Sequence, residues 1–448
     1  MRRITQAAVV VLCLACAPGA QARVLTARDS AVIVLNRLAY GPRPGEIERV
    51  AAMGVRRWLE QQLTPGKDPA REQLESQFEL LKLEREELAE RHLAARAAKR
   101  EQRRDSTRTG DPAMQEMREL AGEFPQIAAA RAVVAENQLQ EILSDFWINH
   151  FNIFLGKNAE RYLLPSFVEE TVRPRVFGRF EDLLVATAES PAMMVYLDNT
   201  MSVAEGATSP RLEQARERNR RRGSVRMDSL LARLEARLPS GVNENYAREL
   251  LELHTLGVDG GYTQKDIENA ARILTGWGVE PANRGGGFVY RDWAHDRGEK
   301  TVLGVRFPAG RGREEGLELL RMLARHPATM QHVTTRLCRK LVSDDPPAGA
   351  VEAGVAAWRR SNGSIREVVK AIVLSPEFWS EGASRTQLKT PLEFVVSSVR
   401  AVGGSVGTEP GLARALARLG QPLYLQPVPT GYEETAEAWT NSAALFEP

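Results

Sequence analysis

The side chains best suited to chemistry in this chain are histidines and acids that lie far apart in the sequence. His150 falls at the centre of an aromatic, apolar helix face, and His254 lies on the apolar side of a second helix. His295 and Asp296 follow aromatic residues in a β-rich stretch. Three nitrogen or carboxylate ligands with one open position suit hydrolytic zinc chemistry. His150, His254 and His295 are therefore candidate metal ligands, and a divalent metal such as zinc is the candidate cofactor.

Glu249 adds an acid to this group, five residues before His254. Glu249, His254, His295 and Asp296 are the candidate catalytic residues of a hydrolase. The alternative is that the buried histidines hydrogen-bond to the backbone and that Glu249 joins a structural ion pair. Spacing along the chain does not decide between these interpretations, because convergence depends on the tertiary fold.

A polar group at the start of the His254 helix supplies candidate binding residues. They are Asn243, Glu244, Asn245 and Arg248. Positions four apart on a helix are neighbours, so Arg248 and Glu252 share one face, as do Asn245 and Glu249. These side chains are free to pair with one another or to bind a ligand.

Residues 243–277 must position most of these side chains, and they are predicted to form two helices joined by a tight glycine turn. Asn243 is a good N-cap, and Gly257 sits where the first helix ends. Thr263 with Asp266 predicts a capping box that opens the second helix, which ends near Gly276.

The whole chain is predicted to be mostly α: a multi-helical single body with a small β-hairpin or sheet near residues 286–308 and long helical insertions. The predicted divisions are a cleaved signal peptide at 1–22, N-terminal helices at 23–65, a charged helical insertion at 66–111, central helices at 112–205, an arginine-rich insertion or linker at 206–240, and a motif-bearing helical region with the small β element at 241–448.

Two charged stretches stand out from the rest of the chain. Residues 71–104 predict a long solvated helix that packs one narrow apolar seam on the body, with a self-associating coiled coil as the alternative. The arginine-dense residues 208–225 are typical of a solvated linker, with binding to an acidic partner as the alternative.

The first 22 residues predict export. Arg2 and Arg3 precede an apolar run that ends at Ala20-Gln21-Ala22, a small-residue cleavage site. The run is short for a membrane span, so no transmembrane segment is expected after cleavage. Cys13 occupies a position where lipoprotein signals carry an aliphatic residue, which disfavours a lipid anchor. The expected location is periplasmic or extracellular.

Cleavage would leave a chain of balanced charge. Lys plus Arg would fall from 60 to 58 with the loss of Arg2 and Arg3, which equals the 58 Asp plus Glu. Net charge therefore gives no reason to expect nucleic-acid or membrane binding. Cys338 would be the one remaining cysteine, so no internal disulfide is expected, and its apolar helical setting predicts a buried, inert thiol.

Residues 243–277 resemble the signature of a bacterial family known as domain of unknown function 1800. Further blocks that resemble the family, in the same order, are residues 35–50, 144–151, 189–199, 295–304, 326–347, 389–401 and 420–432. The resemblance implies an exported, mainly helical protein, often encoded beside an exported family with a sulfatase-like fold, which is a candidate partner. It implies no reaction and transfers no catalytic residue. Asn243, Glu244, Asn245, Arg248, Glu249, His254, His295 and Asp296 fall in its blocks, whereas residues 71–104 and 208–238 depart from its pattern as insertions.

Two hypotheses for function follow. The first is an envelope protein that binds or assembles with an exported partner. The second is a periplasmic hydrolase, with or without a metal, that uses the His, Glu and Asp candidates.

Overall fold

The computed structural model describes residues 25–105, 110–157, 159–235, 241–380 and 387–440 of the chain. The predicted signal peptide, residues 1–22, lies outside these ranges. Within them the molecule is mostly helical and has two small antiparallel sheets, which confirms the predicted fold class. No helix of the described residues has the length and apolarity needed to cross a membrane.

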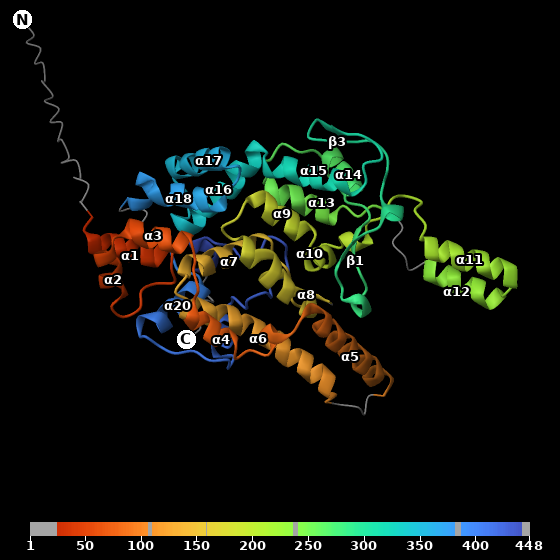
Figure 1. The fold of residues 1–448 in the computed structure, drawn as a ribbon, viewed down its shortest axis with the longest axis horizontal. Helices are drawn as coiled ribbons and strands as arrows, with labels where there is room; N and C mark the ends of the chain where they lie inside the picture. The colour runs from red at the N-terminus through yellow and green to blue at the C-terminus, as the bar shows by residue number, and fades with distance from the viewer. Residues whose placement is uncertain (1–24, 106–109, 158, 236–240, 381–386, 441–448) are drawn as a thin grey trace, which may run out of the picture.

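The first third of the chain forms the helices at the left and bottom of Figure 1. They are α1 (Ala27–Arg37), α2 (Glu46–Met53), α3 (Val55–Leu63), α4 (Pro69–Glu75), η1 (Leu80–Lys82), α5 (Arg85–Arg104), α6 (Pro112–Val134) and α7 (Gln138–His150).

The middle third supplies short helices of the body and one projecting pair. They are α8 (Glu160–Ser166), η2 (Phe167–Val172), η3 (Arg173–Arg175), α9 (Phe180–Ala188), α10 (Pro191–Tyr196), η4 (Asn199–Met201), α11 (Pro210–Arg222) and α12 (Val225–Glu235).

The last third holds the strands and the remaining helices. They are α13 (Asn245–Glu249), η5 (Leu250–Thr255), α14 (Gln264–Ile273), β1 (Trp277–Val279), η6 (Ala282–Arg284), β2 (Phe288–Tyr290), η7 (Asp292–Ala294), β3 (Lys300–Val302), β4 (Val305–Phe307), α15 (Arg313–Ala324), α16 (Pro327–Leu341), α17 (Ala348–Ser361), α18 (Ile365–Leu374), η8 (Pro376–Trp379), α20 (Pro391–Ala401), α21 (Gly411–Arg418) and α22 (Ala436–Trp439).

α7 lies at the centre of the body (Figure 1) because one of its faces is wholly apolar. Leu139, Leu143, Phe146 and Trp147 are all fully buried in one hydrophobic cluster that runs from α1 to the C-terminal loops. Side chains three and four positions apart share a helix face, so this spacing directs all four to the core.

A buried arginine of α20 joins the C-terminal part of the body to α2 and α6. Arg400 of α20 is 1% exposed and donates to the carbonyl oxygens of Gly41 and Val133, each at 2.9 Å. Its third contact is an ion pair of 3.1 Å with Glu46 of α2. A buried guanidinium needs such partners, so this contact fixes α20 against α2 and α6.

The β element consists of two hairpins. β1 pairs with β2, with Trp277 opposite Tyr290, and β3 pairs with β4, with Lys300 opposite Phe307. The second hairpin turns at Leu303 and Gly304, both at positive φ, as a two-residue turn requires.

Residues 71–104 were predicted to form one continuous helix, and that prediction is wrong because the helix is interrupted. The chain forms α4, turns through residues 76–84 with the short η1, and then begins α5. Leu74, Phe78 and Leu80 are all buried, and Glu123 of α6 accepts the Leu80 N–H at 2.9 Å. The turn lets successive apolar side chains reach α6, which a straight helix could not do.

The arginine-dense stretch is helical as well. α11 and α12 lie side by side and project from the body at the right of Figure 1. Leu212 and Leu231 are buried, yet neither belongs to the central hydrophobic cluster. The pair therefore has a small apolar contact of its own.

The helix pair of residues 243–277 forms largely as predicted. The capping box of Thr263 and Asp266 is complete, and Gly257 turns the chain at a φ of 84°. The first helix differs: it widens into the π-helix η5 at Leu250 and ends at Thr255, whose hydroxyl donates to the Leu250 carbonyl at 2.6 Å. Cys338 is buried, and burial raises the pKa of its thiol to about 12, as its setting predicted.

Candidate functional site

His150 and His254 meet in the core, and a third histidine joins them. Nε2 of His150 lies 3.1 Å from the carbonyl oxygen of His254. The ring centroid of His150 is 6.3 Å from that of His254 and 6.3 Å from that of His332 on α16. Both His150 and His254 are 1% exposed, whereas His332 is partly exposed.

Both ring nitrogens of His150 are occupied by the protein. Arg336 donates to Nδ1 at 2.8 Å, so Nε2 carries the hydrogen and donates to the His254 carbonyl. Burial and the Arg336 charge lower the pKa of His150 well below its ordinary value, and the same two causes lower the pKa of His254 to about 3. Among the described residues no group of three or more His, Cys, Asp or Glu is placed to hold a metal ion.

His295 lies in a separate buried polar group near the hairpins. Its Nδ1 is 2.9 Å from the Thr275 carbonyl oxygen, and its Nε2 hydrogen-bonds to the Glu315 carboxylate. Glu315 also accepts from Lys300 at 2.8 Å. In the described part of the chain, no hydrogen bond or ring contact joins His295 to His150 or His254.

Asp296, the neighbour of His295, forms a two-bond ion pair with Arg272 of α14. The bonds from Nε and Nη2 measure 2.8 and 3.1 Å. Although partial burial acts to raise the pKa of Asp296, its hydrogen bonds to Arg272 and to a backbone N–H lower it below the ordinary value. This carboxylate connects the end of α14 to the segment before β3.

The candidate binding residues of the first signature helix contact the protein itself. Glu244 accepts from Arg248 at 3.2 Å and from Gln264 at 2.8 Å, which links α13 to the start of α14. Asn243 accepts the N–H of Asn245 at 2.9 Å, and Asn245 donates to the Leu197 carbonyl at 3.2 Å.

Glu249 is half-buried on the same helix. Burial, with the nearby Glu252 charge, raises the pKa of Glu249 above its ordinary value. Among the described residues, no contact joins Glu249 to His150 or His254.

A pocket that is partly open to solvent lies beside α7 on the side away from the histidines. We call it the central pocket. The lining residues used below are Tyr40, Arg131, Glu141, Asp145, Asn149, Asn152, Arg173, Lys340, Tyr424, Tyr432 and Glu434.

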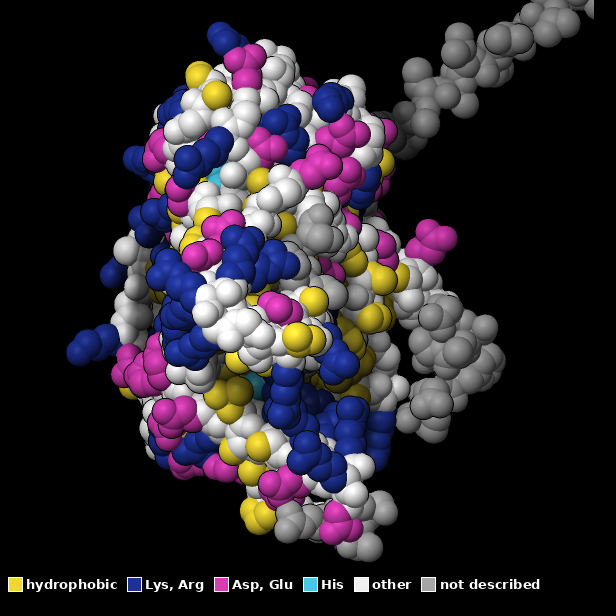
Figure 2. Space-filling model, turned by 90° about the vertical axis from the view of Figure 1, so that its right-hand side faces the viewer, with side chains coloured by type: hydrophobic (Ala, Val, Ile, Leu, Met, Phe, Trp, Pro, Cys, Tyr) yellow, Lys and Arg dark blue, Asp and Glu magenta, His cyan; other side chains and the backbone are white. Residues whose placement is uncertain are grey.

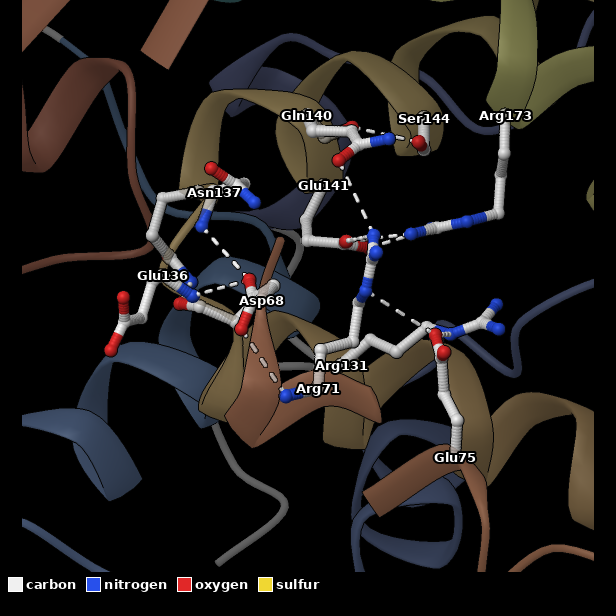
Figure 3. Close-up of polar contacts among 12 residues, drawn as sticks. Asp68, Arg71, Glu75, Arg131, Glu136, Asn137, Gln140, Glu141, Ser144 and Arg173 are labelled. Atoms are coloured by element: carbon white, nitrogen blue, oxygen red, sulfur yellow. Dashed lines mark hydrogen bonds and ion pairs between the residues drawn. The ribbon is translucent and has the colours of Figure 1, made fainter. Parts of the chain in front are cut away.

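One wall of the central pocket is a network of paired charges (Figure 3). Glu141 accepts two hydrogen bonds from Arg173, both at 2.7 Å, and both side chains are buried. Arg131 donates to Glu75 at 2.7 Å and to Glu169 at 2.6 Å. Burial acts to raise the pKa of Glu141, but the Arg173 charge and hydrogen bonds lower it below its ordinary value. The carboxylates and guanidinium groups of this wall are therefore ionised, neutralise one another and are held rigidly by their hydrogen bonds.

Asp145 lies on α7 one turn beyond Glu141 and has a weaker partner. Lys340 approaches its Oδ2 at 3.3 Å but binds Glu393 more closely, at 2.9 Å. The side chain is 26% exposed. Desolvation raises the pKa of Asp145 above its ordinary value despite the Lys340 charge, and Glu393 and Glu434 act in the same direction. Asp145 is thus a reachable carboxyl that holds its proton more tightly than usual.

Two tyrosine hydroxyls complete the polar surface of the central pocket. Neither Tyr40 nor Tyr424 has a hydroxyl hydrogen bond among the described residues, although both side chains are largely buried. Burial raises the pKa of each, so both hydroxyls keep their protons and can donate.

The loop of residues 420–434 closes the central pocket and is fastened by two asparagines. Asn149 donates to the Tyr432 carbonyl at 2.8 Å and accepts the Tyr432 N–H at 2.7 Å. Asn152 donates to the carbonyls of Gln426 and Val428, at 3.0 and 2.8 Å. The position of Tyr424 therefore depends on amides at the end of α7.

Sequence reasoning did not select the residues of the central pocket. Tyr40, Asp145, Lys340 and Tyr424 all lie in blocks that resembled the family, yet residues 243–277 contribute no lining residue. A signal was present in α7. Its polar residues at 141, 145 and 149 recur at steps of four, which marks a polar stripe on an otherwise buried helix.

In comparisons with known proteins, a family model described as "Protein of unknown function (DUF1800)" matches residues 33–448. No curated protein and no solved structure matched the chain.

Proposed function

Because the chain belongs to this family of unknown function, we propose its role from its own geometry: it is an exported protein that binds a polar small molecule in the central pocket. The observation that carries the proposal is the set of polar groups left for a ligand. The surrounding guanidinium groups are paired with carboxylates, whereas Asp145, Tyr40 and Tyr424 face the pocket with weak partners or none among the described residues.

The chemistry of these groups selects the ligand class. The Asp145 carboxyl accepts hydrogen bonds when ionised, and the tyrosine hydroxyls both donate and accept. A small molecule bearing amino or hydroxyl groups, such as a sugar, a polyol or a diamine, satisfies all three. A hydrogen bond to a charged group contributes about 1.5–3 kcal/mol, so one contact with ionised Asp145 would be a large share of the affinity.

Ligand-observed NMR with mixtures of monosaccharides, amino acids and diamines tests this proposal. We expect saturation transfer to at least one class with the wild type and its loss in Asp145→Asn and Tyr424→Phe. Asp259→Asn, in an exposed turn, is the matched control and keeps the signal. The proposal fails if no class receives transfer, or if the pocket variants bind as the wild type does.

A second candidate function is hydrolysis, and the raised pKa of Asp145 favours it. A carboxyl whose pKa is raised is better suited to general-acid catalysis than an ordinary one. Glu434 lines the same pocket and supplies a second carboxylate. Chromogenic esters, glycosides and phosphoesters test this candidate: turnover would disappear in Asp145→Asn and persist in Asp259→Asn. Equal turnover in both variants would exclude Asp145 as the acid.

Export and an exported partner are further parts of the proposal. The pattern of residues 1–22 supports export, and the family resemblance supports a sulfatase-like partner. Fractionation of cells that express the chain with and without residues 1–22 tests export, since the shortened chain should stay in the cytoplasm. Co-purification of the tagged protein from envelope extract tests the partner, and recovery of the protein alone would count against it.

A further inference from the structure

The helix pair α11–α12 is an arm rather than part of the body. It projects at the right of Figure 1, and the end of α5 projects below it on the same side. The buried side chains of the arm, Leu212 and Leu231, lie outside the central hydrophobic cluster. The arm therefore contributes little to the core, and core packing does not account for the side chains on its surface.

The arm is strongly basic. Residues 210–235 hold eight arginines against four acidic residues. The arginines are Arg211, Arg216, Arg218, Arg220, Arg221, Arg222, Arg226 and Arg233, and the acids are Glu213, Glu217, Asp228 and Glu235. Arg220 and Arg221 share the single carboxylate of Glu217 and remain 78% and 79% exposed.

α12 also carries an exposed apolar stripe. Met227, Leu230 and Leu234 lie at steps of three and four and so share one helix face. They are 42%, 49% and 47% exposed, and Val225 at the start of the helix is 78% exposed. Apolar side chains gathered on one face in this way mark an interaction site more often than a free surface.

The end of α5 adds a second basic projection. Its last turns hold Arg96, Lys99, Arg100, Arg103 and Arg104, all exposed, against the one acid Glu101. Figure 2 looks onto this side and shows Lys and Arg side chains gathered over its middle and lower parts, with hydrophobic side chains among them. Two separate basic projections on one side suit a broad, flat surface better than a small partner.

We propose that this face, formed by α11, α12 and the end of α5, docks on an anionic phospholipid bilayer. The arginines meet the headgroup phosphates, and Met227, Leu230 and Leu234 enter the boundary between headgroups and acyl chains, as the apolar face of an interfacial helix does. A second copy of the chain is a poor occupant, because it would bring two faces of like charge together. This proposal is independent of the ligand in the central pocket.

Vesicle co-sedimentation tests the proposal with the full-length mature protein. Vesicles of equal parts phosphatidylglycerol and phosphatidylcholine are compared with vesicles of phosphatidylcholine alone. We expect binding to the anionic vesicles at low salt, weakening as salt rises, and little binding to the neutral ones.

Variants distinguish the contribution of the arginines to vesicle binding from that of the apolar stripe. The triple change Arg218→Glu, Arg220→Glu and Arg221→Glu should weaken binding by at least about tenfold. Leu230→Ser with Leu234→Ser should weaken it at every salt concentration. The matched control is Arg56→Glu with Arg57→Glu, an exposed pair on α3 at the opposite side of the body, which should bind as the wild type does.

Three results of the vesicle experiments would overturn the proposal. They are an absence of binding to anionic vesicles at low salt, equal binding to both vesicle types, and equal loss in the α3 control and the arm variant. Dimerisation in solution that the leucine variants abolish would also overturn it in favour of a second copy. Thermal unfolding of each variant should match the wild type, because the arm lies outside the central cluster.

Discussion

At the residue scale, Glu141 and Arg173 show how this protein places charge inside its body. Their side chains are 5% and 9% exposed and joined by two hydrogen bonds of 2.7 Å. A buried pair of this kind adds little stability over an apolar pair of the same shape, but loss of one partner leaves an uncompensated charge. The pair is therefore sensitive to single substitutions.

We predict that Glu141→Gln destabilises the protein by about 3–5 kcal/mol, because the Arg173 guanidinium then loses its buried counter-charge. Urea denaturation measures the change. Glu217→Gln removes the partner of exposed arginines and should cost no more than about 1 kcal/mol. Similar losses in the two variants would show that the Glu141 pair is solvated rather than buried.

The histidine cluster predicts acid sensitivity. The folded-state pKa of His254 is about 3 and that of His150 lies well below its ordinary value of 6.5. Below pH 6.5 these histidines bind protons in the unfolded chain but not in the folded protein. The free energy of unfolding is therefore highest above pH 6.5 and falls as the pH is lowered toward 3. For His254 the loss at pH 5 is about 2 kcal/mol, since one unit of pKa corresponds to about 1.4 kcal/mol, and His150 acts in the same direction.

Urea denaturation at pH 7.5 and pH 5 measures this loss. His254→Leu removes one of the two groups and should make the difference between the two pH values smaller by about 2 kcal/mol. An unchanged difference would mean that His254 titrates alike in the folded and unfolded states.

At the scale of single elements, α7 contributes residues both to the histidine cluster and to the central pocket. Its apolar face fixes it in the core and presents His150, while the stripe with Glu141, Asp145 and Asn149 lines the central pocket. The helical repeat separates the two faces, so the order of residues in α7 fixes which side chains are core and which are available to a ligand.

The loop that closes the central pocket depends on a glycine. Gly431 has a φ of 75°, and a Cβ there would lie 2.4 Å from the carbonyl oxygen of Asn149 and 2.6 Å from its Oδ1. We predict that Gly431→Ala displaces the loop, lowers stability by about 1–3 kcal/mol and weakens ligand binding at the pocket. Thermal unfolding and ligand-observed NMR measure the two effects.

Gly420 at the start of the same loop is the matched control for this change. Its φ of 86° is also positive, but a Cβ there would meet no atom within 4 Å. Gly420→Ala therefore carries the backbone strain without the clash and should keep ligand binding. Loss of binding in both variants would show that backbone strain in the loop, rather than the clash with Asn149, weakens ligand binding.

At the scale of the whole molecule, the two charged stretches differ in how they join the body. Leu88 and Ala89 of α5 are buried in the central cluster, whereas the buried leucines of the α11–α12 arm are not. We predict that replacing residues 210–235 with a short glycine–serine linker changes stability by less than about 1 kcal/mol, because no central contact is lost.

Deletion of residues 85–104 is the comparison for the arm deletion. It removes Leu88, Ala89 and His92 from the core and should lower the thermal midpoint strongly. Calorimetry of the two deletions measures the contrast. A large loss on removal of the arm would show that α11 and α12 stabilise the body through contacts at their base.

The sequence by itself determined the features that depend on neighbours three or four positions apart. The capping box of Thr263 and Asp266, the turn at Gly257, the buried Cys338 and the apolar face of α7 follow from local patterns, and so does the mostly α fold. Such interactions form within one turn of a helix, so their residues appear together in the chain.

Only the tertiary structure decided which distant side chains meet. It joined His150 to His254 and His332, placed His295 with Glu315, and assembled the central pocket from Tyr40, Asp145, Lys340 and Tyr424. It also broke the charged helix near Phe78 and widened the first signature helix into η5. These outcomes depend on crossing angles, loop paths and competition for burial across the whole core, which no local spacing encodes.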